Sequence, residues 1–162
     1  MSQDDDYGFD DILEMAYEEI EAPKTPPEGT YELEVISGKL RKGKGENGPA
    51  GEAFFPCKIV KAFDDVNEAA LTEFGNDGIA DSRVYFRIPM FERRDAWNVR
   101  RFVEKTLGAS VNGATKLPEA VAQSKGLHFI GFVRHRQNTK DPEGPPLVDV
   151  TSLVRSVLQV MF

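Results

Sequence analysis

The sequence has a single cysteine, Cys57, and two histidines among its 162 residues. One cysteine excludes an internal disulfide and a zinc site built on cysteines. Cys57 lies in an apolar stretch of strand character, so we expect a small buried thiol rather than a nucleophile. His128 and His135 are seven residues apart and would point to opposite faces of one strand. We therefore expect no metal ion and no other cofactor.

Long apolar runs and a basic leader are also missing. The uninterrupted apolar stretches are far shorter than a membrane span, and the chain opens with Met-Ser-Gln-Asp-Asp-Asp. We expect no membrane association and a cytoplasmic location, which would be the host cytoplasm for a phage protein. Residues 38–44 superficially match a phosphate-binding loop, but Gly45 stands where that motif has Ser or Thr. Since no nucleophile–base arrangement is supported either, we expect a protein that is not an enzyme.

Basic residues are absent from the first 22 positions, which hold nine carboxylates. The other 18 acidic residues face all 20 Lys and Arg, so the net charge of −7 divides into a strongly acidic start and a body of +2. Repelling charges and scarce apolar surface predict an acidic disordered tail and proline-rich linker over residues 1–28. The folded domain is then expected in residues 29–162.

Three interpretations of this tail stay open. It could keep the protein soluble, compete with nucleic acid for a basic face, or bind a replication or recombination protein. The last two are favoured because aromatic and aliphatic residues sit among the acids, which a pure solubility segment does not need. The candidate autoinhibitory or partner-binding residues are Asp4, Asp5, Asp6, Tyr7, Phe9, Asp10, Asp11 and Ile12.

Alternation of apolar and polar residues predicts five strands, over residues 30–40, 53–63, 83–89, 127–137 and 147–155. Helical spacing predicts a helix over residues 96–107 that begins at Asp95 as N-cap and ends at Gly108. Its buried stripe would be Val99, Phe102, Val103 and Leu107, and Trp97 is expected in the core. Three strands, a helix and two strands is the order of the OB fold, a mainly β, five-stranded barrel with a helix between strands three and four.

The third predicted strand carries the strongest functional signal. Within residues 83–89, aliphatic and aromatic side chains suited to a core alternate with Arg83, Tyr85 and Arg87. A face of cations and an aromatic ring suits single-stranded nucleic acid, which presents phosphates and bases that can stack. Further cations and one aromatic residue lie on the neighbouring predicted strands and loops. The complete set of candidate DNA-binding residues is Lys39, Arg41, Lys42, Lys44, Phe54, Lys58, Arg83, Tyr85, Arg87, Arg93, Arg94, Arg134 and Arg136.

From about Pro26 to Arg155 the chain resembles small phage-encoded single-stranded DNA-binding proteins. The resemblance is carried by residues 26–35 (PPEGTYELEV), by residues 83–89 followed by residues 97–108 (WNVRRFVEKTLG), and by the late strand pair that ends at Val154. It implies an OB fold and binding of single strands irrespective of sequence, during phage DNA replication or recombination.

In that interpretation Phe54 and Tyr85 stack bases, and the cations hold phosphates. The preference between DNA and RNA and the oligomeric state stay open. One alternative is a phage virion accessory or decoration protein that uses the same face as a protein interface. Another is a small acidic regulator that occupies a host protein through residues 1–22.

Overall fold

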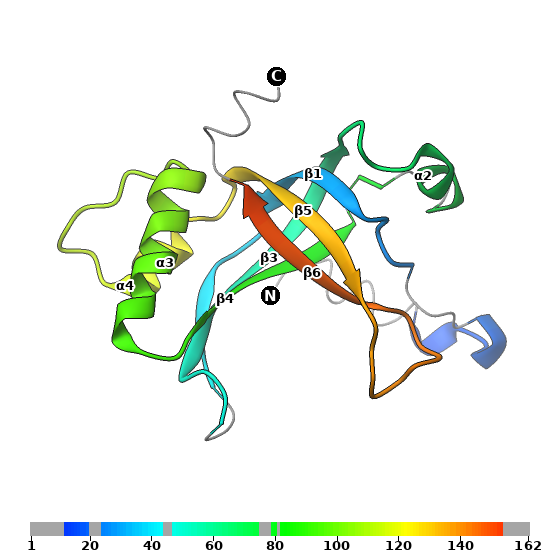
Figure 1. Ribbon diagram of the computed structural model, residues 1–162, viewed down its shortest axis with the longest axis horizontal. Helices are drawn as coiled ribbons and strands as arrows, with labels where there is room; N and C mark the ends of the chain where they lie inside the picture. The colour runs from blue at the N-terminus through cyan, green and yellow to red at the C-terminus, as the bar shows by residue number, and fades with distance from the viewer. Residues whose placement is uncertain (1–11, 20–23, 44–46, 75–78, 81, 154–162) are drawn as a thin grey trace.

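Strands dominate the computed structural model, which describes residues 12–19, 24–43, 47–74, 79–80 and 82–153. The protein is a mixed α/β chain with one antiparallel six-stranded sheet (Figure 1). The strands are β1 (Gly29–Val35), β2 (Lys39–Lys42), β3 (Gly51–Ala62), β4 (Arg83–Met90), β5 (His128–Arg136) and β6 (Leu147–Leu153). The helical elements are η1 (Tyr17–Glu19), α2 (Glu68–Phe74), η2 (Arg93–Asp95), α3 (Ala96–Arg101), η3 (Phe102–Thr106) and α4 (Leu117–Ala122).

The predicted number of five strands is wrong by one, because residues 30–40 form two strands. Both pair with the same edge of β3, β1 with residues 57–62 and β2 with residues 51–54. Between them, Gly38 lies so close to α4 that a Cβ atom there would overlap the carbonyl oxygen of Val121. The chain bends at Ile36 and passes close to α4 at Gly38, a feature that alternation alone does not reveal.

Sheet closure also differs from the predicted barrel. The hydrogen-bonded order is β2-β3-β1-β5-β6, and β4 pairs with the edge of β3 opposite β1 and β2. Residues of β4 and β6 approach within 8 Å, Cα to Cα, but no ladder joins the two strands. The sheet is therefore curled toward closure without being closed by hydrogen bonds.

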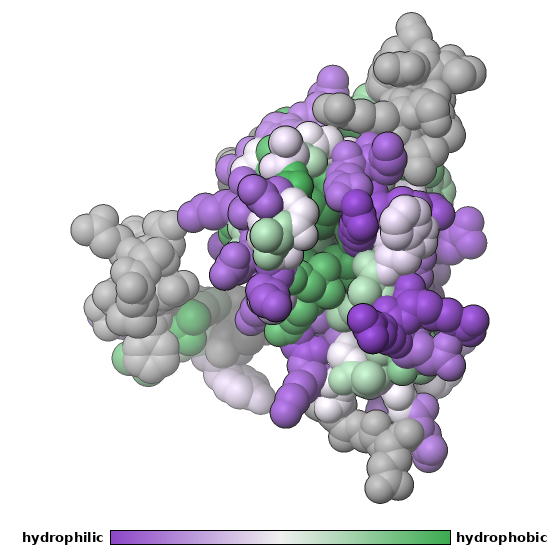
Figure 2. Space-filling model, turned by 90° about the vertical axis from the view of Figure 1, so that its left-hand side faces the viewer, coloured by the Kyte–Doolittle hydropathy of each residue, from purple (hydrophilic) through white to green (hydrophobic). Residues whose placement is uncertain are grey.

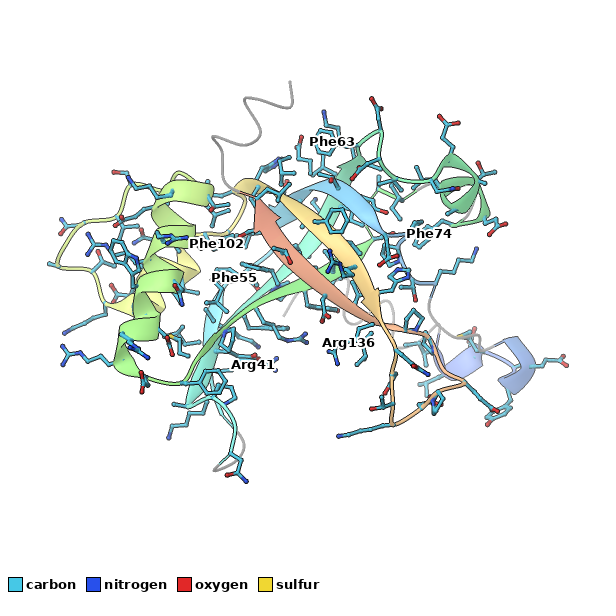
Figure 3. All side chains as sticks on the ribbon, in the orientation of Figure 1. Arg41, Phe55, Phe63, Phe74, Phe102 and Arg136 are labelled. Atoms are coloured by element: carbon cyan, nitrogen blue, oxygen red, sulfur yellow. The ribbon has the colours of Figure 1, made fainter. Side chains whose placement is uncertain are left out.

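An aromatic cluster fills the centre of the core, between the concave side of the sheet and α3–η3. The ring centroid of Phe102 lies 5.0 Å from Phe55, 4.7 Å from Phe86 and 5.1 Å from Phe129. Figure 3 labels Phe102 on the helix and Phe55 on the sheet. These four rings come from η3 and from strands β3, β4 and β5. The helical element therefore contacts three strands through one side chain, Phe102. Cys57 is buried as predicted, and burial raises the pKa of its thiol to about 12.

The predicted helix over residues 96–107 is confirmed in extent as α3 followed by the π-helical turn η3. Its predicted stripe, Val99, Phe102, Val103 and Leu107, is buried. Gly108 has φ = 73° and ends the helix in the left-handed region that glycine favours. One prediction at its start is wrong, because Trp97 is 55% exposed. The α-helix begins at Ala96 as predicted and is preceded by the short 3-10 helix η2.

Asp95 stabilises the turn before this helix rather than capping it. Its carboxylate accepts hydrogen bonds from the backbone N–H groups of Phe91, at 2.8 Å, and Glu92, at 2.9 Å. These bonds hold the pKa of Asp95 below its usual value, because they favour the charged form. The turn that leaves β4 is thereby fixed against the start of the helix.

Residues 24–28, predicted as part of a linker, contact the sheet. The Tyr31 hydroxyl donates to the Pro27 carbonyl at 2.6 Å, and the backbone N–H of His135 donates to the Glu28 carboxylate at 2.8 Å. The folded part therefore includes the prolines just before β1. Of the predicted tail residues, those from Asp4 to Asp11 lie outside the described residues, and Ile12 is 59% exposed.

Candidate nucleic-acid interface

The two faces of β4 separate as the sequence predicts. Val84, Phe86 and Ile88 are buried, and Arg83, Tyr85 and Arg87 are exposed on the convex side of the sheet. Because β3 pairs with β4 on one edge and with β2 on the other, the outward side chains of three strands meet there. Lys39 of β2 and Arg87 of β4 are both directly opposite Phe54 of β3.

Phe54 is the centre of this surface, although its own ring is covered. The Tyr85 ring stacks beside it, with centroids 5.7 Å apart and planes within 8°. The Arg41 guanidinium lies 4.0 Å from the Phe54 centroid, the Arg87 guanidinium 5.3 Å and the Lys39 ammonium 5.8 Å. Phe54 is only 8% exposed, whereas Tyr85 is 42% exposed. Tyr85 is thus the ring presented to a ligand, and Phe54 is the support beneath it.

Glu52 completes the group, which we call the Phe54 cluster: Lys39, Arg41, Glu52, Phe54, Tyr85 and Arg87. The Glu52 carboxylate lies 3.0 Å from Arg41 and 3.9 Å from Arg87. With three cations and one carboxylate, the cluster carries a net charge of +2. Glu52 was missed by sequence reasoning, although strand alternation places it on the same face as Phe54.

The cationic face extends from the cluster toward the other end of β4 and stops at β1. Lys58 is directly opposite Arg83, as a pairing of the second and third predicted strands requires, and its ammonium lies 3.5 Å from Glu34 of β1. Glu34 and Glu32 also hold His128 of β5, at 3.0 Å and 2.8 Å from its two ring nitrogens. We call these two carboxylates the acidic border; because Glu32 also lies 4.0 Å from Lys61, the cations at this edge already have counter-charges.

Arg134 and Arg136 lie beyond this border, on β5. The Arg136 guanidinium is 3.0 Å from Asp149 of β6, and Arg134 is directly opposite Asp149 in the ladder. Figure 3 shows Arg136 on a different part of the molecule from Arg41. The fold therefore does not bring these two predicted residues together with the Phe54 cluster.

The remaining predicted cations surround the end of β4. Lys42, Arg93 and Arg94 are exposed, and the Arg94 guanidinium lies 2.7 Å from Glu92. Lys44 lies outside the described residues. Phe91, an aromatic residue interleaved with these cations in the sequence, is 60% exposed in the same turn. The Asp95 carboxylate holds this turn through the backbone N–H groups of Phe91 and Glu92.

A hollow lies on the helical side of the molecule, away from the Phe54 cluster. It measures about 220 Å³ and is lined by Val103, Val111 and Leu117. Figure 2 views this side and shows hydrophobic surface enclosed by hydrophilic side chains. Of its described lining residues, Arg100 is the one cation, and Glu104 lies 3.0 Å from it. This hollow lacks the free charge that a phosphate backbone needs.

Among the described residues, no three His, Cys, Asp or Glu side chains are placed to hold a metal ion. No helix within the described ranges is long and apolar enough to cross a membrane. Comparison with models of protein families gave no match, and comparison with curated protein sequences gave none either.

Proposed function

We propose that this protein binds single-stranded DNA irrespective of sequence, without catalysing a reaction, and acts in phage DNA replication or recombination. The Phe54 cluster is the observation that carries the proposal. It presents an exposed tyrosine ring stacked beside Phe54, and Lys39, Arg41 and Arg87 lie over the Phe54 ring. Bases stack on such a ring whatever their identity, and the cations hold the phosphates on either side.

The proposal includes an OB fold. If β1 and β2 are taken as one bent strand, the order β4-β3-β1-β5-β6 brings its two end strands close together. The helix α3–η3 lies between β4 and β5 in the chain and packs against the core. In this fold, the face formed by the second and third strands binds oligonucleotides. Those strands correspond to β3 and β4, which carry the Phe54 cluster.

A titration with oligo-dT at several salt concentrations tests the proposed function. The affinity should fall log-linearly with salt, with a slope of about −0.7 per neutralised phosphate and so about −2 for the three cations of the cluster. Matched duplex should bind more weakly, because its bases are not free to stack. An RNA oligonucleotide establishes the sugar preference. Affinity for oligo-dT that does not change with salt would contradict the proposal and favour a protein interface.

The acidic start of the chain is proposed to compete with DNA for this face. Deleting residues 1–22 removes nine carboxylates, so the affinity for oligo-dT should rise several-fold at low salt and little at high salt. Fluorescence anisotropy measures both. A full-length control keeps the length and removes charge by changing five tail aspartates to asparagine: Asp4, Asp5, Asp6, Asp10 and Asp11. If this control binds like the unaltered protein, the tail does not compete through its charge.

A further inference from the structure

A groove adjoins the Phe54 cluster where β2, β3 and β4 end. It has a volume of about 440 Å³, which is within the range of small-molecule sites. Leu40, Met90, Phe91 and Ala96 line it with apolar surface. The groove thus offers a hydrophobic wall that includes an exposed aromatic ring.

Three cations stand on the same lining: Arg41, Lys42 and Arg93. The acidic residue of the lining, Glu92, has its Oε2 atom 2.7 Å from the Arg94 guanidinium, and Arg41 lies 3.0 Å from Glu52 of the Phe54 cluster. An apolar wall with a cationic rim is complementary to a ligand that joins a flat, stackable ring to an anion. An uncharged aliphatic segment would offer no counter-charge to Lys42 and Arg93.

Local structure keeps the groove in shape. Gly51 pairs with Lys42 on one side and with Met90 on the other, which holds the end of β2 and the start of β3 beside the end of β4. The two backbone hydrogen bonds to the Asp95 carboxylate fix the turn that carries Phe91 and Arg93. The wall is therefore built by elements that are already ordered, which lowers the entropy cost of binding.

We infer that this groove binds one unpaired nucleotide of the strand held on the Phe54 cluster, with its base against Phe91 and its phosphate at Arg93 and Lys42. This inference rests on the proposed function and extends it by a second stacking site. Arg41 connects the two sites, since it lines the groove and also lies 4.0 Å from the Phe54 centroid. A strand leaving Tyr85 along β4 would reach the groove without crossing the acidic border on β1.

Phe91→Ala and Arg93→Ala, each measured with (dT)12, test this site. Each should lower the affinity by about tenfold, the loss expected for one stacked base or its anchoring phosphate contact. Trp97→Ala is the matched control, because Trp97 is exposed to a similar extent but does not line the groove. It should change the affinity less than twofold. Photo-cross-linking with 5-iododeoxyuridine in the oligonucleotide should attach it to the peptide that contains Phe91.

The outcomes separate the groove from the proposed function. If the unaltered protein does not bind (dT)12, the proposed function itself fails. If it binds, but Phe91→Ala and Arg93→Ala bind equally well and the cross-link lies elsewhere, the groove inference alone is overturned. The groove inference is also overturned if both variants bind (dT)12 normally but deleting residues 1–22 no longer raises their affinity. The groove would then hold the acidic segment of the chain. Thermal unfolding should be unchanged in both variants, since both side chains are exposed.

Discussion

Replacing Tyr85 and Arg87 together with alanine should lower the affinity for oligo-dT by about a hundredfold. The tyrosine ring is the exposed stacking surface of the Phe54 cluster, and a stacked base contributes about 1–3 kcal/mol. Arg87 adds a phosphate contact beside it, and the combined loss corresponds to about 2.7 kcal/mol. Both side chains point outward from β4, so the buried face of the strand is untouched. Fluorescence anisotropy at low salt measures the affinity, and thermal unfolding verifies the fold.

Glu52→Gln is the control that changes the affinity in the opposite direction. It removes the carboxylate that lies 3.0 Å from Arg41 and 3.9 Å from Arg87, and leaves both guanidinium groups to the DNA. Since an exposed ion pair contributes up to about 1 kcal/mol, affinity should rise by up to about fivefold. If the double variant binds like the unaltered protein, the ligand uses another face. If Glu52→Gln weakens binding, the carboxylate orders the cluster and does not compete with phosphate.

The sequence predicts which side of β4 faces the core, because strand alternation is a local property. It does not predict what covers an outward side chain. Phe54 is outward by alternation, yet three cations from β2 and β4 and the Tyr85 ring reduce its exposure to 8%. That arrangement depends on the register between strands that are distant in the chain. The role of Phe54 consequently changes from a stacking surface to the support of one.

Long-range geometry also explains the other differences. Arg134 and Arg136 were predicted to bind DNA because they are cations on a strand. They lie apart from the Phe54 cluster because β1, with its acidic border, lies between β3 and β5 in the sheet. Trp97 was predicted in the core because of its helical spacing. Its side chain is 55% exposed, whereas Val99 of the same helix is buried. Helical spacing predicts that a helix forms, but which of its side chains are covered depends on the strands that pack against it.

Phe102→Ala should reduce the free energy of unfolding by about 3–5 kcal/mol, the range for removing a large buried aromatic side chain. The Phe102 ring is 4% exposed and contacts Phe55, Phe86 and Phe129, so its loss leaves a cavity where the helix meets three strands. Urea denaturation measures this as a lower midpoint at unchanged slope. Trp97→Ala on the same helix should change stability by no more than about 0.5 kcal/mol, because its side chain is exposed.

The same variant separates the stability of the fold from the chemistry of the convex face. Phe102 lies on the core side of β3 and β4, whereas Tyr85 and the cations lie on the other. Phe102→Ala should therefore bind oligo-dT normally at a temperature where it is still folded, although it unfolds at much lower urea. A reduction of the free energy of unfolding by less than about 1 kcal/mol would mean that Phe102 contributes little to the packing of the core. Lost binding by the folded variant would mean that the helix positions the convex face as well as supporting it.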